Sequence, residues 1–397
     1  MTKRKLDLTF MFATIGLILI FAASASPIPT YVRMQNEFDI STGTISMTAV
    51  SYFVGCILAL LVFSRVSDFI GRKKVAVFTI LLSIIGLLLL INTRNGDMLL
   101  IARSIQGFSC GLGSSTLSVL IIESGLNKNE NLVASIAGSA VLLGLAIGGL
   151  MAGVAAQVLP NNRNLTYFIL VMLLVVTMIG ISFGVETTEL KKGAIKSLKP
   201  QVNLPKNTFN IIIPAAGCFI ATWAFGGYFQ AFSATISKSV FNLDSPLIAA
   251  IILVSYMAPN IIGSNLSNRF NVEKGQFIGI IGFVLAICLM FVSIEIKNMA
   301  LYLIFVIVAG IMQGIAYSSS LNALLRRVIK SESTGLLSVV YMISYIGAGL
   351  PSFIAGKVSG AFNFYQITLG YVILVILVGL IVLSNLHINR KKSTIKD

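Results

Sequence analysis

Charge is scarce in this 397-residue sequence: 11% of the residues are Asp, Glu, Lys or Arg, while 56% are hydrophobic. A soluble globular domain of average composition carries about a quarter charged residues. The sequence has one histidine, and its 14 acidic residues lie at the ends of apolar runs or between them. It contains neither an HExxH nor a Walker A motif. These absences exclude a soluble fold and argue against an enzyme.

Cysteine is also rare, and its positions argue against disulfides and metal sites. The four cysteines, Cys56, Cys110, Cys218 and Cys288, all lie inside apolar runs. Isolated cysteines in such runs behave as small apolar packing residues. We therefore expect no metal and no cofactor.

Twelve apolar runs are long enough to cross a bilayer, because a hydrocarbon core of about 30 Å needs about 20 residues of α-helix. The sequence therefore predicts an all-α membrane protein whose surroundings are the lipid bilayer. The predicted spans are 8–32, 43–64, 75–92, 98–121, 132–157, 165–185, 208–235, 244–264, 276–293, 299–322, 334–356 and 364–386.

Basic residues are distributed unevenly about these spans. With the N-terminus in the cytoplasm, 22 of the 29 lysines and arginines fall on the cytoplasmic side, six fall outside, and Arg103 lies within the fourth span. The positive-inside rule predicts a multi-pass protein of the cell membrane with both termini in the cytoplasm. The net charge of +15 then reflects topology rather than a nucleic-acid partner.

The N-terminal run imitates a cleavable secretory signal, with basic residues at 3–5 and small residues at 23–25. Cleavage would leave eleven spans and break the internal symmetry. The longest hydrophilic connector divides the chain into a bundle at 1–186, a cytoplasmic linker at 187–207, and a second bundle with a short cytoplasmic tail at 208–397. Each bundle has six predicted helices.

Two short matches relate these halves. The segment Ser64 to Asp68 aligns with Ser264 to Asn268, and 105–107 (IQG) aligns with 312–314 (MQG). Weak internal symmetry of this kind is typical of secondary transporters built from duplicated bundles. In this alignment Asp68 and Arg103 have no charged counterparts in the second half.

Two motifs then give the chain a resemblance to a known family. The turn SRVSDFIGRKK carries Asp68, Gly71, Arg72 and Lys73 at the positions of the motif G-x-x-x-D-[RK]-x-G-[RK]-[RK], although Ser64 and Phe69 depart from it. In the fourth span, Arg103 and Gly107 fit R-x-x-x-G. With twelve spans in a six-plus-six repeat, the sequence resembles the major facilitator superfamily. The resemblance implies two six-helix bundles related by a pseudo-two-fold axis, and transport by alternating access.

The fifth span resembles that of drug–proton antiporters of this superfamily. Gly144, Gly148 and Gly153 stand where those antiporters carry glycine, whereas Gly149 replaces a proline and Ala152 a glycine. Glycines let helices approach closely, so helix packing and a directional role are both open. A packing or conformational role is also predicted for Gly107, Pro259 and Pro351.

The turn at 64–74 has two interpretations. The family resemblance implies a cytoplasmic latch in which Asp68, Gly71, Arg72 and Lys73 make and break contacts with the eleventh span. Asp68 lies near the interface, where a carboxylate can pair with Arg72 or with a helix N-terminus. In the alternative, the basic residues hold the turn inside the cell, a role that needs the cations but no aspartate.

Arg103 is the strong charge placed inside the membrane. Its burial costs at least about 2.5 kcal/mol unless it is partnered, which makes it a candidate functional residue. It can bind a substrate carboxylate or keep the cavity positive. The alternative is a hydrogen bond to backbone carbonyls of the first or second span.

Ion coupling has two candidate carboxylates, Asp68 and Glu123, and we expect protons to be the coupling ion. Glu123 lies at the inner end of the fourth span, where it reaches the mouth of a cavity or remains an interfacial charge. Coupling through the ionisation of the substrate itself stays open.

The substrate pathway is predicted from polar and aromatic residues deep in the spans. A largely apolar lining with a few placed polar groups suits small amphiphiles, although tyrosine and tryptophan also form interfacial belts. The candidates are Arg103, Gln106, Trp223, Tyr228, Gln313 and Tyr317.

The sequence thus predicts a monomeric secondary active transporter that exports small organic molecules, as in multidrug efflux by antiport. Three alternatives stay open. They are a dedicated exporter of one endogenous anionic or zwitterionic metabolite, such as an amino-acid-derived chelator, an uptake permease, and a transporter-like membrane sensor.

Overall fold

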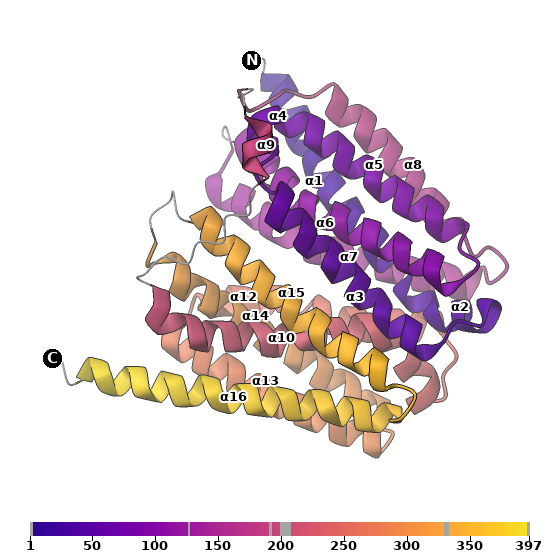
Figure 1. Cartoon of the computed structure of the whole chain (residues 1–397), viewed down its shortest axis with the longest axis vertical. Helices are drawn as coiled ribbons and strands as arrows, with labels where there is room; N and C mark the ends of the chain where they lie inside the picture. Colours follow the sequence, from indigo (N-terminus) through magenta and orange to yellow (C-terminus); the bar gives the residue numbers. More distant parts are fainter. Residues whose placement is uncertain (1–2, 126–127, 190–192, 199–207, 329–332, 395–397) are drawn as a thin grey trace. The chain divides into compact units, whose positions relative to one another are not determined.

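Figure 1 shows the computed structural model of the chain, which describes residues 3–125, 128–189, 193–198, 208–328 and 333–394. Within these ranges, twelve helical segments of 18 to 36 residues are long and apolar enough to cross a membrane. The predicted number of spans is confirmed. The predicted linker at 187–207 lies partly outside the described residues.

The chain divides into two compact units, of which the first comprises Met1–Pro200 and Ser245–Ile251. Within it, α6 packs against both α3 and α5, and α1 packs against α7 and α8 (Figure 1). Its helical elements are α1 (Lys3–Ala25), η1 (Ile28–Thr30), α2 (Tyr31–Phe38), α3 (Thr42–Leu58), η2 (Ala59–Phe63), α4 (Ser67–Ile70), α5 (Arg72–Ile91), α6 (Gly96–Ser124), α7 (Glu130–Val158), α8 (Leu165–Ser182) and α9 (Ala194–Ser197).

The second unit comprises Gln201–Asp244 and Ile252–Asp397. Within it, α14 packs against α12 and α13, and α10 packs against α14, α15 and α16. Its helical elements are α10 (Phe209–Thr235), η4 (Ile236–Val240), α11 (Pro246–Met257), whose first turns belong to the first unit, α12 (Asn260–Ser267), α13 (Val272–Glu295), α14 (Met299–Leu325), α15 (Ser333–Val358) and α16 (Phe364–Thr394).

Large apolar side chains remain exposed along the spans. On α8 and its C-cap residue, the exposed fractions are 69% at Met172, 59% at Val176, 51% at Ile179 and 71% at Phe183. These positions recur every three or four residues, so they form one stripe along the helix. A stripe of this kind on a water-soluble protein would be a liability, whereas lipid tails solvate it.

Close helix crossings in the first unit depend on glycines of α6. A Cβ on Gly107 would overlap the backbone oxygen of Tyr52 on α3, and one on Gly111 would lie 2.7 Å from the backbone oxygen of Cys56. Both contacts are closer than any that a real Cβ atom makes with a neighbouring atom. The predicted packing role of Gly107 therefore has a direct geometric cause: α6 and α3 touch through their backbones.

The second unit repeats this crossing. On α14, Gly310 and Gly314 occupy the same relation to the backbone oxygens of Tyr256 and Asn260. The two helices also start alike, because Asn95 and Asn298 each accept a hydrogen bond from the backbone N–H three residues later, at 2.9 and 3.0 Å. The crossing itself gives the register: Gly55 lies against the Ser104 oxygen as Gly263 lies against the Ile311 oxygen, and Gly107 lies against Tyr52 as Gly314 lies against Asn260. At the crossing, the predicted alignment of Gly107 with Gly314, an offset of 207, therefore pairs residues with equivalent neighbours.

The turn that follows each crossing differs between the units. Residues 64–71 separate η2 from α5 and include the short helix α4, whereas 268–271 alone separate α12 from α13. Ser264 lies inside α12, whereas Ser64 follows η2, but the predicted offset of 200 holds at the end of the turn, where Gly71 precedes α5 and Asn271 precedes α13. Gly71 links α4 to α5 at φ 107°, a backbone conformation that favours glycine. The first unit thus carries extra residues around Asp68.

The two prolines behave differently. Pro259 lies between α11, which ends at Met257, and α12, which begins at Asn260. Pro351 lies inside the continuous helix α15. The eighth span is therefore interrupted at its proline, as expected for a residue that removes one backbone donor, while the eleventh span accommodates its proline.

Candidate functional site

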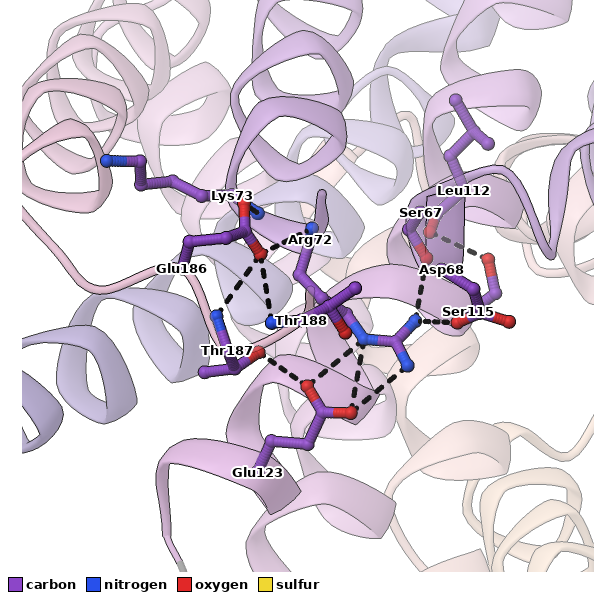
Figure 2. A network of polar contacts seen from close by, with 10 residues as sticks. All are labelled: Ser67, Asp68, Arg72, Lys73, Leu112, Ser115, Glu123, Glu186, Thr187 and Thr188. Atoms are coloured by element: carbon purple, nitrogen blue, oxygen red, sulfur yellow. Dashed lines mark hydrogen bonds and ion pairs between the residues drawn. The ribbon is translucent and has the colours of Figure 1, made fainter. Parts of the chain in front are cut away.

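The turn between η2 and α5 holds a network of charged side chains centred on Arg72 (Figure 2). Its Nη1 lies 2.5 Å from the Asp68 carboxylate and donates to Ser67 Oγ at 2.8 Å. Its Nε and Nη2 each donate to Glu123 at 3.1 Å, so the two N–H groups meet the carboxylate as a fork. One guanidinium therefore joins two carboxylates from α4 and α6, and its side chain is only 12% exposed.

A third carboxylate, Glu186, supports this arrangement from the segment after α8. It accepts hydrogen bonds from the backbone N–H groups of Arg72 at 2.8 Å and Lys73 at 3.1 Å. These N–H groups begin α5 and have no partner within their own helix, so an anion there also complements the helix dipole. The next residue, Thr187, donates to Glu123 at 2.5 Å. We call Ser67, Asp68, Arg72, Glu123, Glu186 and Thr187 the turn network.

Sequence reasoning missed Glu186. It lies 114 residues from Arg72, and its one visible signal was its place as the first residue after the sixth apolar run. Lys73, predicted for the latch, instead donates through Nζ to the backbone oxygens of Ser182 at 3.2 Å and Gly184 at 3.4 Å. A cation at these carbonyls complements the C-terminal end of α8. The roles of Asp68 and Glu123 in latching and coupling stay predictions.

The second candidate site is the side chain of Arg103, which is completely buried within the first unit. Its Nη1 donates to the backbone oxygen of Ser24 on α1 at 2.5 Å and to Gln106 Oε1 at 2.7 Å. Gln106 in turn donates to the backbone oxygen of Ala23 at 2.9 Å. The guanidinium carbon lies 4.7 Å from the ring centroid of Tyr52, a cation–π distance. Arg103 and Gln106 therefore act as one polar group that links α6 to α1.

Arg103 remains incompletely satisfied. In the part of the chain that the structure describes, its Nε and Nη2 have no hydrogen-bond partner and no carboxylate forms an ion pair with it. The backbone contact accounts for one nitrogen of the guanidinium. Two donors and a positive charge are left uncompensated, which makes the site chemically complementary to an anion.

Aromatic residues of the predicted pathway gather in the second unit. The ring of Trp223 on α10 lies 6.1 Å from that of Tyr317 on α14 and 5.1 Å from that of Tyr345 on α15. Tyr228 belongs to a different cluster: it is fully buried, its hydroxyl lies 2.9 Å from Thr368, and it packs against other aromatic rings. The structure thus groups Trp223 with Tyr317 and sets Tyr228 apart.

The glycines of the fifth span have a packing explanation. A Cβ on Gly144 or Gly148 would overlap the backbone of Ile18 or Ala22 on α1. One on Gly153 would lie 2.5 Å from Ala250, which belongs to the same unit. Close packing alone therefore accounts for glycine at these three positions.

The sequence model of the Major Facilitator Superfamily matches residues 13–350, which is most of the chain. The chain belongs to the major facilitator superfamily. Its fold is the all-α arrangement of that family, and it is a multi-pass membrane protein.

Individual relatives match this chain over shorter stretches. It is 35% identical over 81 residues to an uncharacterized transporter of Rickettsia felis, a stretch that is 20% of each chain. It is 34% identical over 98 residues to a uridine/deoxyuridine transporter of Lactococcus lactis subsp. cremoris, 24% of this chain and 20% of that protein. It is 27% identical over 118 residues to the sugar transporter ERD6-like 8 of Arabidopsis thaliana, 30% of this chain and 25% of that protein. The matched stretches thus span a quarter of these relatives' length at most.

Proposed function

We propose that the chain is a secondary active transporter that moves a small organic anion or zwitterion across the cell membrane by alternating access. Arg103 binds the anionic group of the substrate. The observation that carries this proposal is a fully buried guanidinium with two unpartnered nitrogens and no carboxylate paired with it among the described residues.

The argument rests on the cost of leaving this charge alone. An arginine at the centre of a span costs at least about 2.5 kcal/mol, and each buried donor without a partner adds about 1–3 kcal/mol. A substrate carboxylate offers two oxygens to a planar guanidinium and so recovers this cost on binding. A residue needed only to tie α6 to α1 could be neutral, as Gln106 is, because a single N–H group reaches the Ser24 carbonyl.

For direction and coupling we propose export driven by protons. The glycine spacing of α7 matches drug–proton antiporters, and the turn network offers two carboxylates, Asp68 and Glu123, that share Arg72. Protonation of either would release its hold on the guanidinium. Uptake is the second candidate, favoured by the similarity to transporters named for uridine and sugar. The excess of basic residues on one side supports cytoplasmic termini, and we propose a monomer as the working unit.

The test is transport by the purified protein in liposomes under an imposed pH gradient. The solutes are carboxylates, each paired with its neutral amide. We expect carboxylates to move, amides to move at least about tenfold more slowly, and movement to stop when the gradient is collapsed. Failure of every solute to move would overturn transport, and equal rates for carboxylates and amides would overturn the role of Arg103.

Direction is tested in cells by comparing metabolites inside and outside a deletion strain and its parent. Export predicts that the deletion strain accumulates an acidic compound internally, and restoring the intact chain should reverse this. Loss of an acidic compound from the interior of the deletion strain would establish uptake instead.

A further inference from the structure

Aromatic side chains from three helices meet in the second unit. Tyr317 on α14 lies against Phe219 at 5.0 Å and Trp223 at 6.1 Å between ring centroids, and Trp223 meets Tyr345 of α15 edge to face at 5.1 Å. Tyr341 stacks on Tyr345 one turn away, with 18° between the ring planes. Trp223 and Tyr317 are each partly exposed, so they form an open aromatic wall rather than a sealed core.

The packing of α10 on α14 fixes what lies next to this wall. Ala215 and Phe219 pack with Leu324, while Trp223 meets Tyr317, so α10 and α14 run antiparallel. The residues one turn after Trp223 on α10 therefore face the residues one turn before Tyr317 on α14. From this register we infer that Gly226 lies on the side of α10 that approaches Gln313.

Gly226 marks unfilled space. It is buried, yet a Cβ built on it would meet no atom of the described residues within 4 Å. The adjacent Gly227 is different, because its Cβ would lie 2.5 Å from the backbone oxygen of Ala348 on α15. Gly227 is thus required for helix packing, whereas Gly226 leaves room that the protein itself does not use.

Gln313 brings an unsatisfied acceptor to the same place. Its side chain is 8% exposed, and Oε1 has no hydrogen-bond partner among the described residues. Buried side-chain oxygens are normally hydrogen-bonded, so an empty one beside unfilled space indicates a missing donor. An amide oxygen accepts and does not donate, which specifies that the missing group carries an N–H or O–H.

We propose that this place is a binding site for a planar aromatic or heteroaromatic ring that carries an N–H donor. The ring lies against Trp223 and Tyr317, occupies the space over Gly226, and donates its N–H to Gln313 Oε1. Flat rings gain from offset or edge-to-face contact with such a wall, and an alicyclic group of the same size does not. The inference rests on the proposed transport function and assigns to the second unit a class of ring that the transported molecules carry.

The test uses the single tryptophan of the chain, Trp223, as a fluorescence reporter in the purified full-length protein. The probes are pyrrole-2-carboxylate and orotate, their N-methylated forms, and cyclopentanecarboxylate, with free tryptophan as the correction for absorption. We expect a saturable change of emission with the first two probes and roughly tenfold weaker binding after N-methylation, because one hydrogen bond is lost. Cyclopentanecarboxylate should leave the emission unchanged.

Two variants locate the site. Gly226→Val puts a side chain into the space, with its Cβ more than 4 Å from other described atoms, and Gln313→Leu removes the acceptor; we expect each to weaken binding at least about tenfold. Gly370→Val is the matched control, because Gly370 on α16 also has open space but is exposed. It should bind like the unmodified protein, and thermal unfolding should show that all three variants fold.

The proposal is overturned if neither aromatic probe alters the emission, if cyclopentanecarboxylate binds equally well, or if Gly226→Val binds unchanged. Failure of the ring-site proposal can be distinguished from failure of the transport proposal. If pyrrole-2-carboxylate and cyclopentanecarboxylate were transported at equal rates, and transport of both required Arg103, the ring site would be refuted and the proposal of anion transport would stand. If the aromatic probes bound at Trp223 but did not move into liposomes, the transport proposal would be refuted and the ring site would stand.

Discussion

Replacing Arg103 with methionine separates a functional role for this residue from a structural one. Methionine has a similar length and is apolar, so it can occupy the same volume in contact with Tyr52. The replacement removes the hydrogen bonds of Nη1 to Ser24 and Gln106. It also removes an uncompensated charge and the two unpartnered nitrogens.

The free energy that the replacement loses and the free energy that it gains are of comparable size. Two hydrogen bonds to a charged donor contribute about 3–6 kcal/mol together. Against this, the buried charge costs at least about 2.5 kcal/mol, and the two unpartnered donors add about 1–3 kcal/mol each. We therefore expect Arg103→Met to lower the free energy of unfolding by no more than about 2 kcal/mol. Such a result is typical of residues kept for function.

Thermal unfolding can be followed with a thiol-reactive fluorophore, because Cys56, Cys110 and Cys218 are buried in the folded chain. Transport of carboxylates is measured on the same preparations in liposomes, with Arg33→Met as the control for loss of an arginine elsewhere. We expect near-normal unfolding and at least about tenfold slower transport for Arg103→Met. A strongly destabilised variant whose folded fraction still transports carboxylates at the normal rate would refute the reasoning.

Three further substitutions test the framework around the candidate sites. Gly107→Ala should lower the free energy of unfolding by roughly 1–3 kcal/mol through overlap with the Tyr52 backbone, whereas Gly370→Ala should not; equal unfolding midpoints would contradict the crossing geometry. Asp68→Asn should insert normally but transport more slowly, and unchanged transport would argue against a latch. Glu186→Gln should destabilise the start of α5 by about 0.3–1 kcal/mol, visible as faster amide exchange there; unaltered exchange would count against the capping role.

Much of what was predicted about the spans and the charged residues came from patterns among residues close together in the sequence. The spans follow from runs of apolar residues, which any helix of that length must place in lipid. The contact between Asp68 and Arg72 was one of two pairings expected for this carboxylate, because both residues lie close together in the same short turn. Arg103 was identified for the same kind of reason, since a charge inside an apolar run is conspicuous without knowledge of its neighbours.

Contacts between distant segments were not predictable in this way. The capping of α5 by Glu186 joins residues more than a hundred positions apart, and no periodicity links them. The space at Gly226 arises because α10 and α14 leave it unfilled, and one glycine among 34 gives no sign of this in sequence.

The internal repeat shows what each half contributes. With the offset of 207, Arg103 corresponds to Gly310, so the second unit has no charged counterpart of the anion site. Asp68 belongs to a turn that is longer in the first unit, so it too has no counterpart. The second unit instead carries the aromatic wall and the empty acceptor of Gln313. If both proposals hold, ionic recognition and the charged switch reside in the first unit and ring recognition in the second.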